Sequence, residues 1–169
     1  VPNQMFDDTA ASDLRAACDS AALQLSAELG SECHIIVRPP FVLAGDVSNA
    51  ALADAYDETI APTCRTLSTS YFDSPPDAPI TILMLACERS YRRYAAKMDG
   101  RAQATFYGYY QKSDRRILLD ASTGTGTLAH ELTHALTHFD FPEIPEWFDE
   151  GLASLHEQSE FTDDGYQLY

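Results

Sequence analysis

The stretch His130-Glu-Leu-Thr-His134 constrains the chain most, because it predicts a helix with two histidines on one side. Apolar residues recur around it at helical spacing, namely Leu128, Leu132, Ala135, Leu136 and Phe139. His130 and His134 then fall on the opposite side, about 6 Å apart along the axis, so both imidazoles can reach one metal ion. Glu131 lies about 100° round the helix from His130, where its carboxylate can reach a metal-bound water.

A second helix is predicted directly downstream, and it supplies a third ligand. Pro145 suits the first turn of that helix. Glu150 then faces the first helix across a short loop, and His130, His134 and Glu150 together fit one Zn²⁺, which usually has three protein ligands in a catalytic site. Gly151 disfavours a helix, and its presence is explained if another helix passes close by at that point.

These residues resemble a known family. His130-Glu131-x-x-His134, followed after fifteen residues by Glu150 in the segment Trp-Phe-Asp-Glu-Gly-Leu-Ala, is similar to the gluzincin group of zinc metallopeptidases, which includes small peptidase MA-like proteins. The resemblance is tight over residues 125–157 and looser upstream. It implies a zinc-dependent peptidase in which His130, His134 and Glu150 are the metal ligands and Glu131 is the general base.

A peptidase also needs a hydrogen-bond donor to the oxyanion of its tetrahedral intermediate. By the resemblance, this donor is often a Tyr or His late in the chain. Tyr109 and Tyr166 are the candidates that we favour as catalytic residues. The alternatives are Tyr107, Tyr110 and His156.

Three further residues bear on the predicted site. Thermolysin-like members of the group carry an Asp four residues after the ligand Glu, where it orients a ligand histidine, but this chain has Ser154 there. The ligands must therefore be oriented by other residues. His138 lies about 12 Å along the helix from His130, too far to share its ion. Glu157 can either bind a substrate amino group or pair locally, and we favour local pairing.

The rest of the chain predicts one α+β domain over residues 1–169. The nearly all-apolar run from Ile80 to Ala86 reads as a central strand that is buried on both faces. The resemblance implies a zincin-like fold, in which a mixed β-sheet is packed by helices and the metal site lies between the two C-terminal helices. Further helices are expected over 9–30, 48–72 and 88–98, with Ser48 as the N-cap of the second and Pro62 kinking or dividing it. Further strands are expected over 33–38, 41–43, 105–110 and 116–120, with residues 41–43 continuing the preceding strand past a bend at Pro39 and Pro40.

The charge distribution limits the classes of partner. The net charge is −15, which argues against nucleic acid and anionic membranes as partners. Eight of the eleven Lys and Arg lie between Arg89 and Arg116, and none follows, whereas eleven Asp and Glu do. No apolar run approaches the ~20 residues that span a membrane. A peptide or protein substrate fits best, with either a cleft that prefers cationic groups or a solvated acidic surface.

The four cysteines are Cys18, Cys33, Cys64 and Cys87, and none has the spacing of a metal site. An even number of cysteines is compatible with two disulfides, and the alternative is four reduced thiols in the interior. We favour disulfides, and hence an extracytoplasmic (secreted or periplasmic) protein.

Two other interpretations of the metal motif remain open. The chain can be a non-catalytic binding module that keeps its zinc site, although retention of Glu131 argues against this, because metal binding alone does not need that carboxylate. The zinc can also be structural, closed by a fourth protein ligand. The sequence does not indicate the substrate or the oligomeric state.

Overall fold

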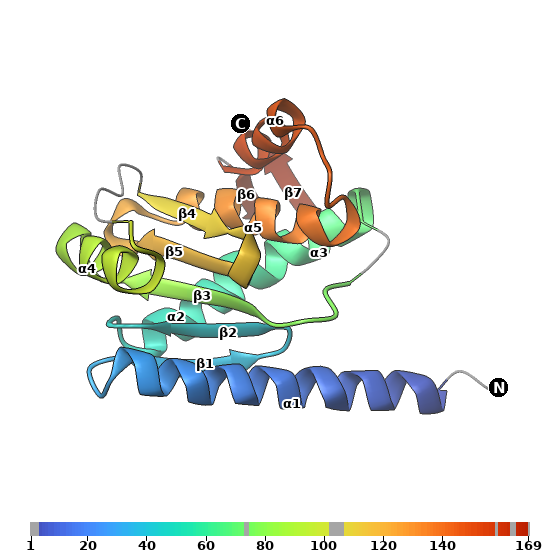
Figure 1. Ribbon diagram of the computed structural model, residues 1–169. Coiled ribbons are helices and arrows are strands. Elements are labelled where there is room, and N and C mark those ends of the chain that lie inside the picture. The colour runs from blue at the N-terminus through green and yellow to red at the C-terminus, as the bar shows by residue number, and fades with distance from the viewer. Residues whose placement is uncertain (1–3, 73–74, 102–106, 158, 163–164, 169) are drawn as a thin grey trace.

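The computed structural model describes residues 4–72, 75–101, 107–157, 159–162 and 165–168. For residues 4–8, 159–162 and 165–168 the description is limited to the backbone. The described residues form a small α+β domain with a mixed sheet and packed helices, as the sequence predicts (Figure 1).

The main sheet has five strands in the order β1-β2-β3-β5-β4. These are β1 (His34–Arg38), β2 (Phe41–Gly45), β3 (Ile80–Leu85), β5 (Arg116–Asp120) and β4 (Gly108–Gln111). β2, β3 and β5 run parallel to one another, whereas β1 and β4 are antiparallel to their neighbours and form the two edges. The prediction of a buried central strand is confirmed, because five of the six residues of β3 are buried.

Helices cover both faces of this sheet (Figure 1). α1 (Gln4–Leu29) and α4 (Glu88–Asp99) pack on one face. α2 (Asn49–Ala55), α3 (Ala61–Ser70) and α5 (Gly126–Asp140) pack on the other face. Because side chains alternate along each strand, Leu43 and Ile82 face the layer of α2, α3 and α5, whereas Val42 and Leu83 face α1 and α4.

The C-terminal part of the chain packs on α5 rather than on the sheet. α6 (Glu146–Glu157) follows α5 after a loop of five residues and lies against it. A two-stranded hairpin of β6 (Ser159–Thr162) and β7 (Gly165–Leu168) completes the chain (Figure 1). The two helices that the sequence assigns to the metal site are therefore neighbours.

The turn between the first two strands contains two prolines. Pro39 and Pro40 are joined by a cis peptide bond in the turn between β1 and β2, which pair antiparallel. The expectation that residues 41–43 continue the preceding strand past a bend is therefore wrong, because the chain reverses there.

Ser48 caps α2 as expected, accepting a hydrogen bond from the Ala51 N–H at 3.1 Å. Pro62 divides the next helical run, since it lies in the first turn of α3 after a π-helical turn over Tyr56–Ile60.

The cysteines correct another expectation, because all four thiols are free. Cys18, on α1, is buried on the face of the sheet that α1 and α4 cover, whereas Cys64 packs on the opposite face. Burial raises the pKa of the Cys64 thiol to about 12, so it stays protonated. Cys33 lies 3.3 Å from the Tyr94 hydroxyl, and Cys87 is exposed just before α4. The predicted disulfides are therefore wrong, and they lend no support to an extracytoplasmic location.

None of the helices in the described part of the chain combines the length and the apolar character that a bilayer span requires.

Candidate metal centre

α5 brings two imidazoles together at the surface of the domain. Its back is buried, with Leu128, Leu132 and Ala135 in the core against the sheet. Burial of that stripe fixes the rotation of the helix, so His130 and His134 point away from the sheet side by side. Their Nε2 atoms lie 3.2 Å apart. Two ligands bound to one tetrahedral zinc at 2.0–2.1 Å would lie about 3.3 Å apart, so this spacing suits a shared ion.

α6 adds a carboxylate to this pair. Glu150 Oε2 lies 3.6 Å from His130 Nε2, and Glu150 Oε1 lies 3.7 Å from His134 Nε2. The three residues each offer one ligand atom, and these atoms all lie within 4.8 Å of one another. His130, His134 and Glu150 can therefore hold a metal ion, as the sequence predicts.

Each imidazole also has a carboxylate behind it. Asp149 Oδ2 lies 2.9 Å from His134 Nδ1, and Glu157 Oε2 lies 3.4 Å from His130 Nδ1. A carboxylate at the second ring nitrogen is the usual partner of a metal-ligating histidine, since it fixes the tautomer that leaves Nε2 free to bind metal. The donor set and the tautomers that these carboxylates favour thus fit a bound metal.

Asp149 was not predicted from the sequence as a partner of the candidate metal ligands. It precedes Glu150 directly, so it lies about 100° round α6 and faces α5 while Glu150 faces the cleft. That neighbouring position is the signal that could have revealed it. Ser154, where the resemblance suggested an orienting Asp, is exposed.

His138 lies beside His134 on α5, outside the group of three described residues that could together hold a metal ion. Its Nε2 lies 3.2 Å from Asp149 Oδ2, and its ring stacks on that of His134 with centroids 6.5 Å apart. Its other neighbour is the Tyr110 ring, at a centroid distance of 5.6 Å. Burial lowers the pKa of His138, which opposes the raising effect of Asp149. Asp149 therefore lies between two imidazoles of α5.

Glu131 is buried beside the predicted ligands. Its pKa is raised to about 7, chiefly by burial, with opposing contributions from His134 and from a hydrogen bond to the Tyr110 backbone. Because a carboxylate accepts, Tyr110 donates its N–H here. Tyr110 belongs to β4, the edge strand, so Glu131 sits between the candidate metal ligands and the free edge of the sheet.

These residues share one cleft, of about 520 Å³, which we call the metal cleft. β4, α5 and α6 form its walls, and the members not yet placed in it are Tyr107, Gly108, Tyr109, Lys112 and Thr127. A larger cavity of about 710 Å³ lies on the other side of α6 and is mainly apolar, with Tyr71, Phe72, Phe141 and Phe148 among the residues of its wall. None of the candidate ligands lines the larger cavity, so we place the site in the metal cleft.

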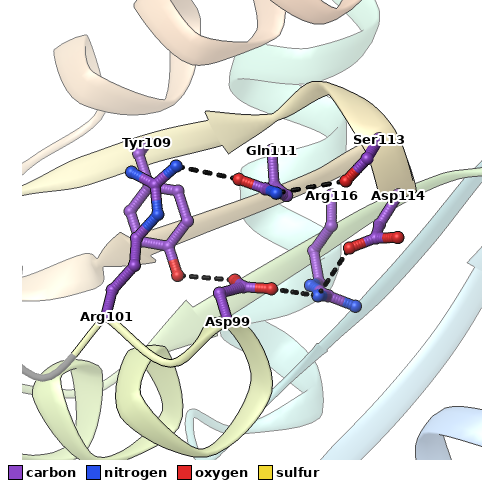
Figure 2. Close-up of polar contacts among 7 residues, drawn as sticks. All are labelled: Asp99, Arg101, Tyr109, Gln111, Ser113, Asp114 and Arg116. Atoms are coloured by element: carbon purple, nitrogen blue, oxygen red, sulfur yellow. Dashed lines mark hydrogen bonds and ion pairs between the residues drawn. The ribbon is translucent and has the colours of Figure 1, made fainter.

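Tyr109, a predicted oxyanion donor, lines the metal cleft, but its hydroxyl is engaged elsewhere. Because neighbouring residues of a strand face opposite ways, Tyr109 packs towards α4 while Tyr110 packs towards α5. The Tyr109 hydroxyl donates to Asp99 Oδ2 at 2.6 Å, and the Arg101 guanidinium lies over its ring at 4.2 Å (Figure 2). Burial and the bond to Asp99 both raise the pKa of Tyr109 strongly. Its hydroxyl therefore points away from the candidate metal ligands.

The other candidates for the oxyanion donor differ in whether they line the metal cleft. Tyr166 lies in β7, but its side chain is outside the described part of the structure. His156 is buried against the Tyr71 ring, at a centroid distance of 5.8 Å, on the side of α6 away from Glu150. Tyr107 and Tyr110 both line the metal cleft.

Comparisons with protein-family models, with curated proteins and with solved structures found no match for this chain.

Proposed function

We propose that this chain is a zinc-dependent peptidase of the gluzincin type, built on a zincin-like domain. The observation that supports this most is the convergence of His130, His134 and Glu150 with the buried Glu131 beside them in one cleft. A metal-binding module needs the first three residues, whereas Glu131 adds a group that can move protons.

Bound zinc would supply Lewis acidity, polarising the amide carbonyl and making a water molecule more acidic. The residues of the chain divide the remaining tasks. Glu131 takes a proton from the attacking water and later passes it to the leaving amine. Asp149 and Glu157 hold the imidazoles of His134 and His130 in the orientation that suits a metal ligand.

β4 offers a binding edge for an extended peptide. The Asp120 N–H donates to the carbonyl of Tyr107, the residue before β4, at 2.8 Å, so the Tyr107 carbonyl is directed towards β5. In an antiparallel ladder the pairing alternates, and Gly108 and Tyr110 therefore turn their backbone groups away from β5. The Tyr110 N–H already donates to Glu131, so the Gly108 N–H and the carbonyl groups of both residues are the ones offered to a substrate. A substrate that adds here as a further strand binds through its backbone, which makes binding tolerant of side chains.

The decisive experiment compares the parent protein with Glu131→Gln. The variant should bind Zn²⁺ with the parent affinity, because Glu131 is not a ligand, yet it should lose hydrolysis of a mixed peptide library followed by mass spectrometry. Glu146→Gln is a matched control on the exposed side of α6 and should keep both properties. Hydrolysis at the parent rate by Glu131→Gln would falsify the proposed mechanism.

The alternative is a non-catalytic module with a zinc site. The absence of an orienting Asp at Ser154 favoured this interpretation, but Asp149 and Glu157 supply carboxylates to the two imidazoles instead. Complete lack of cleavage by fully zinc-loaded parent protein would favour the module. A structural zinc needs a fourth protein ligand, and among the described residues the metal-binding group has three members.

A further inference from the structure

A further cavity, of about 530 Å³, adjoins the metal cleft at the start of α5. We call it the side pocket. It is lined by Tyr107, Thr123, Gly126, Thr127 and Glu157. Tyr107, Thr127 and Glu157 line the metal cleft as well, so a group bound at the candidate ion has direct access to the side pocket.

The lining of the side pocket suits a cation. The Glu157 side chain is 45% exposed, and it provides the negative charge. Thr123 and Thr127 can add hydroxyl acceptors, and the largely exposed Tyr107 offers an aromatic ring, whose face attracts cations. No Lys or Arg of the described chain lines the side pocket, and none follows Arg116 in the sequence.

The opposite end of the metal cleft differs in charge. Lys112 is the one Lys or Arg among the described residues of the cleft wall, and its Nζ lies 2.6 Å from the Pro142 carbonyl oxygen, away from Glu157. The two ends of the metal cleft therefore present opposite charges, Glu157 at one end and Lys112 at the other.

The direction of β4 indicates which way a bound peptide runs between the two ends of the metal cleft. β4 begins at Gly108, which packs against Thr127 beside the side pocket, and it ends at Gln111, next to Lys112. Antiparallel pairing is slightly more stable per residue than parallel pairing. A peptide added antiparallel to β4 therefore lies with the part after the cleaved bond towards Gly108 and the side pocket.

We propose that the preferred substrates carry Lys or Arg on the residue directly after the cleaved bond, and that Glu157 determines this selectivity. The inference rests on the proposed peptidase activity. The charge of Glu157 receives the ammonium or guanidinium group in the side pocket.

Glu157 also lies 3.4 Å from His130 Nδ1, so the test must separate selectivity from positioning of His130. Three quenched fluorescent peptides differ only after the cleaved bond, where they carry Lys, norleucine or Glu. Norleucine resembles Lys in length without its charge. We expect kcat/KM to be at least roughly fivefold higher for Lys than for norleucine, and lowest for Glu.

In Glu157→Gln the Lys-to-norleucine ratio should fall to about one, whereas Glu146→Gln on the same helix should keep the parent ratio. An equal loss of kcat/KM for all three peptides, with the ratio unchanged, would mean that Glu157 only positions His130 and would overturn the proposal. A parent ratio near one would overturn it as well.

A binding measurement keeps this proposal separate from the proposed activity. Fluorescence anisotropy with zinc-loaded Glu131→Gln should show tighter binding of the Lys peptide, and added salt should reduce that preference. If this preference appears while the parent cleaves no peptide, the peptidase proposal fails and the cation selectivity of the side pocket stands. Equal binding of the three peptides overturns the selectivity.

Discussion

Asp149 Oδ2 lies 2.9 Å from His134 Nδ1, and the adjacent Glu150 turns its carboxylate to Nε2 of the same ring. Two consecutive residues of α6 thus address the two nitrogens of one imidazole. One carboxylate is in place to bind an ion, and the other to hold the ring for that ion.

Replacement of Asp149 tests this relationship directly. Asp149→Asn keeps the shape of the side chain but removes the charge that stabilises the Nδ1–H tautomer of His134. We expect zinc affinity to fall by about 10–100-fold, measured by competition with a chromophoric chelator. Ser154→Ala on the exposed side of the same helix should leave the affinity unchanged. An unchanged affinity in Asp149→Asn would show that the short contact does not tune the metal ligands.

Tyr109→Phe tests the part of the sequence prediction that the structure does not support. Turnover should persist, because the Tyr109 hydroxyl faces Asp99 rather than the metal cleft. The free energy of unfolding should fall by about 1–3 kcal/mol, because the buried Asp99 loses a donor and keeps its ion pair with Arg116 (Figure 2). Urea denaturation and a peptide assay check both points. Loss of turnover with unchanged stability would restore the role of Tyr109 as oxyanion donor.

We expect opposite effects on stability when Gly151 and Gly126 are each replaced by alanine. A Cβ on Gly151 would meet nothing within 4 Å, which corrects the expectation of a close helix there. Gly151→Ala should therefore stabilise the protein by up to about 1 kcal/mol. A Cβ on Gly126 would lie 2.8 Å from the Glu157 carbonyl oxygen, so this is where α5 and α6 approach closely.

Gly126→Ala should destabilise the protein by about 1–3 kcal/mol and weaken zinc binding, because it pushes α6 away from α5. Thermal unfolding with and without zinc measures both changes. Equal effects of the two substitutions would contradict the helix contact that we describe.

The buried His156 gives stability a dependence on pH. Burial lowers its pKa from the ordinary value of 6.5, so the folded state binds a proton less readily than the unfolded state. The contribution of neutral His156 to the free energy of unfolding is complete above about pH 6.5, its ordinary pKa. This contribution is lost as the pH falls through the lower pKa of the folded state. His156→Phe keeps a ring against Tyr71 and should reduce the loss of stability between pH 7.5 and pH 5, measured by urea denaturation of the metal-free protein. A loss as steep as that of the parent would contradict this assignment.

Much of the architecture could be predicted because it depends on local patterns. The apolar run at Ile80 indicated a buried strand, and the capping by Ser48 and the division at Pro62 follow from the chemistry of single residues. The reversal at Pro39 and Pro40 was missed, because a bend and a turn place similar residues at the same positions, and only strand pairing distinguishes them.

For the candidate site, local sequence was sufficient to predict the three possible metal ligands. His130 and His134 are brought together by the period of one helix, and Glu150 follows on the next helix after a short loop, so local geometry is sufficient. The orientation of Tyr109 and the partners of the two imidazoles follow only from contacts between elements. The face on which Tyr109 lies depends on which side of β4 meets α5, and the roles of Asp149 and Glu157 depend on how closely α6 packs against α5. Such contacts between elements leave no periodic signal in the sequence, because they are set by the packing of whole surfaces rather than by spacing along the chain.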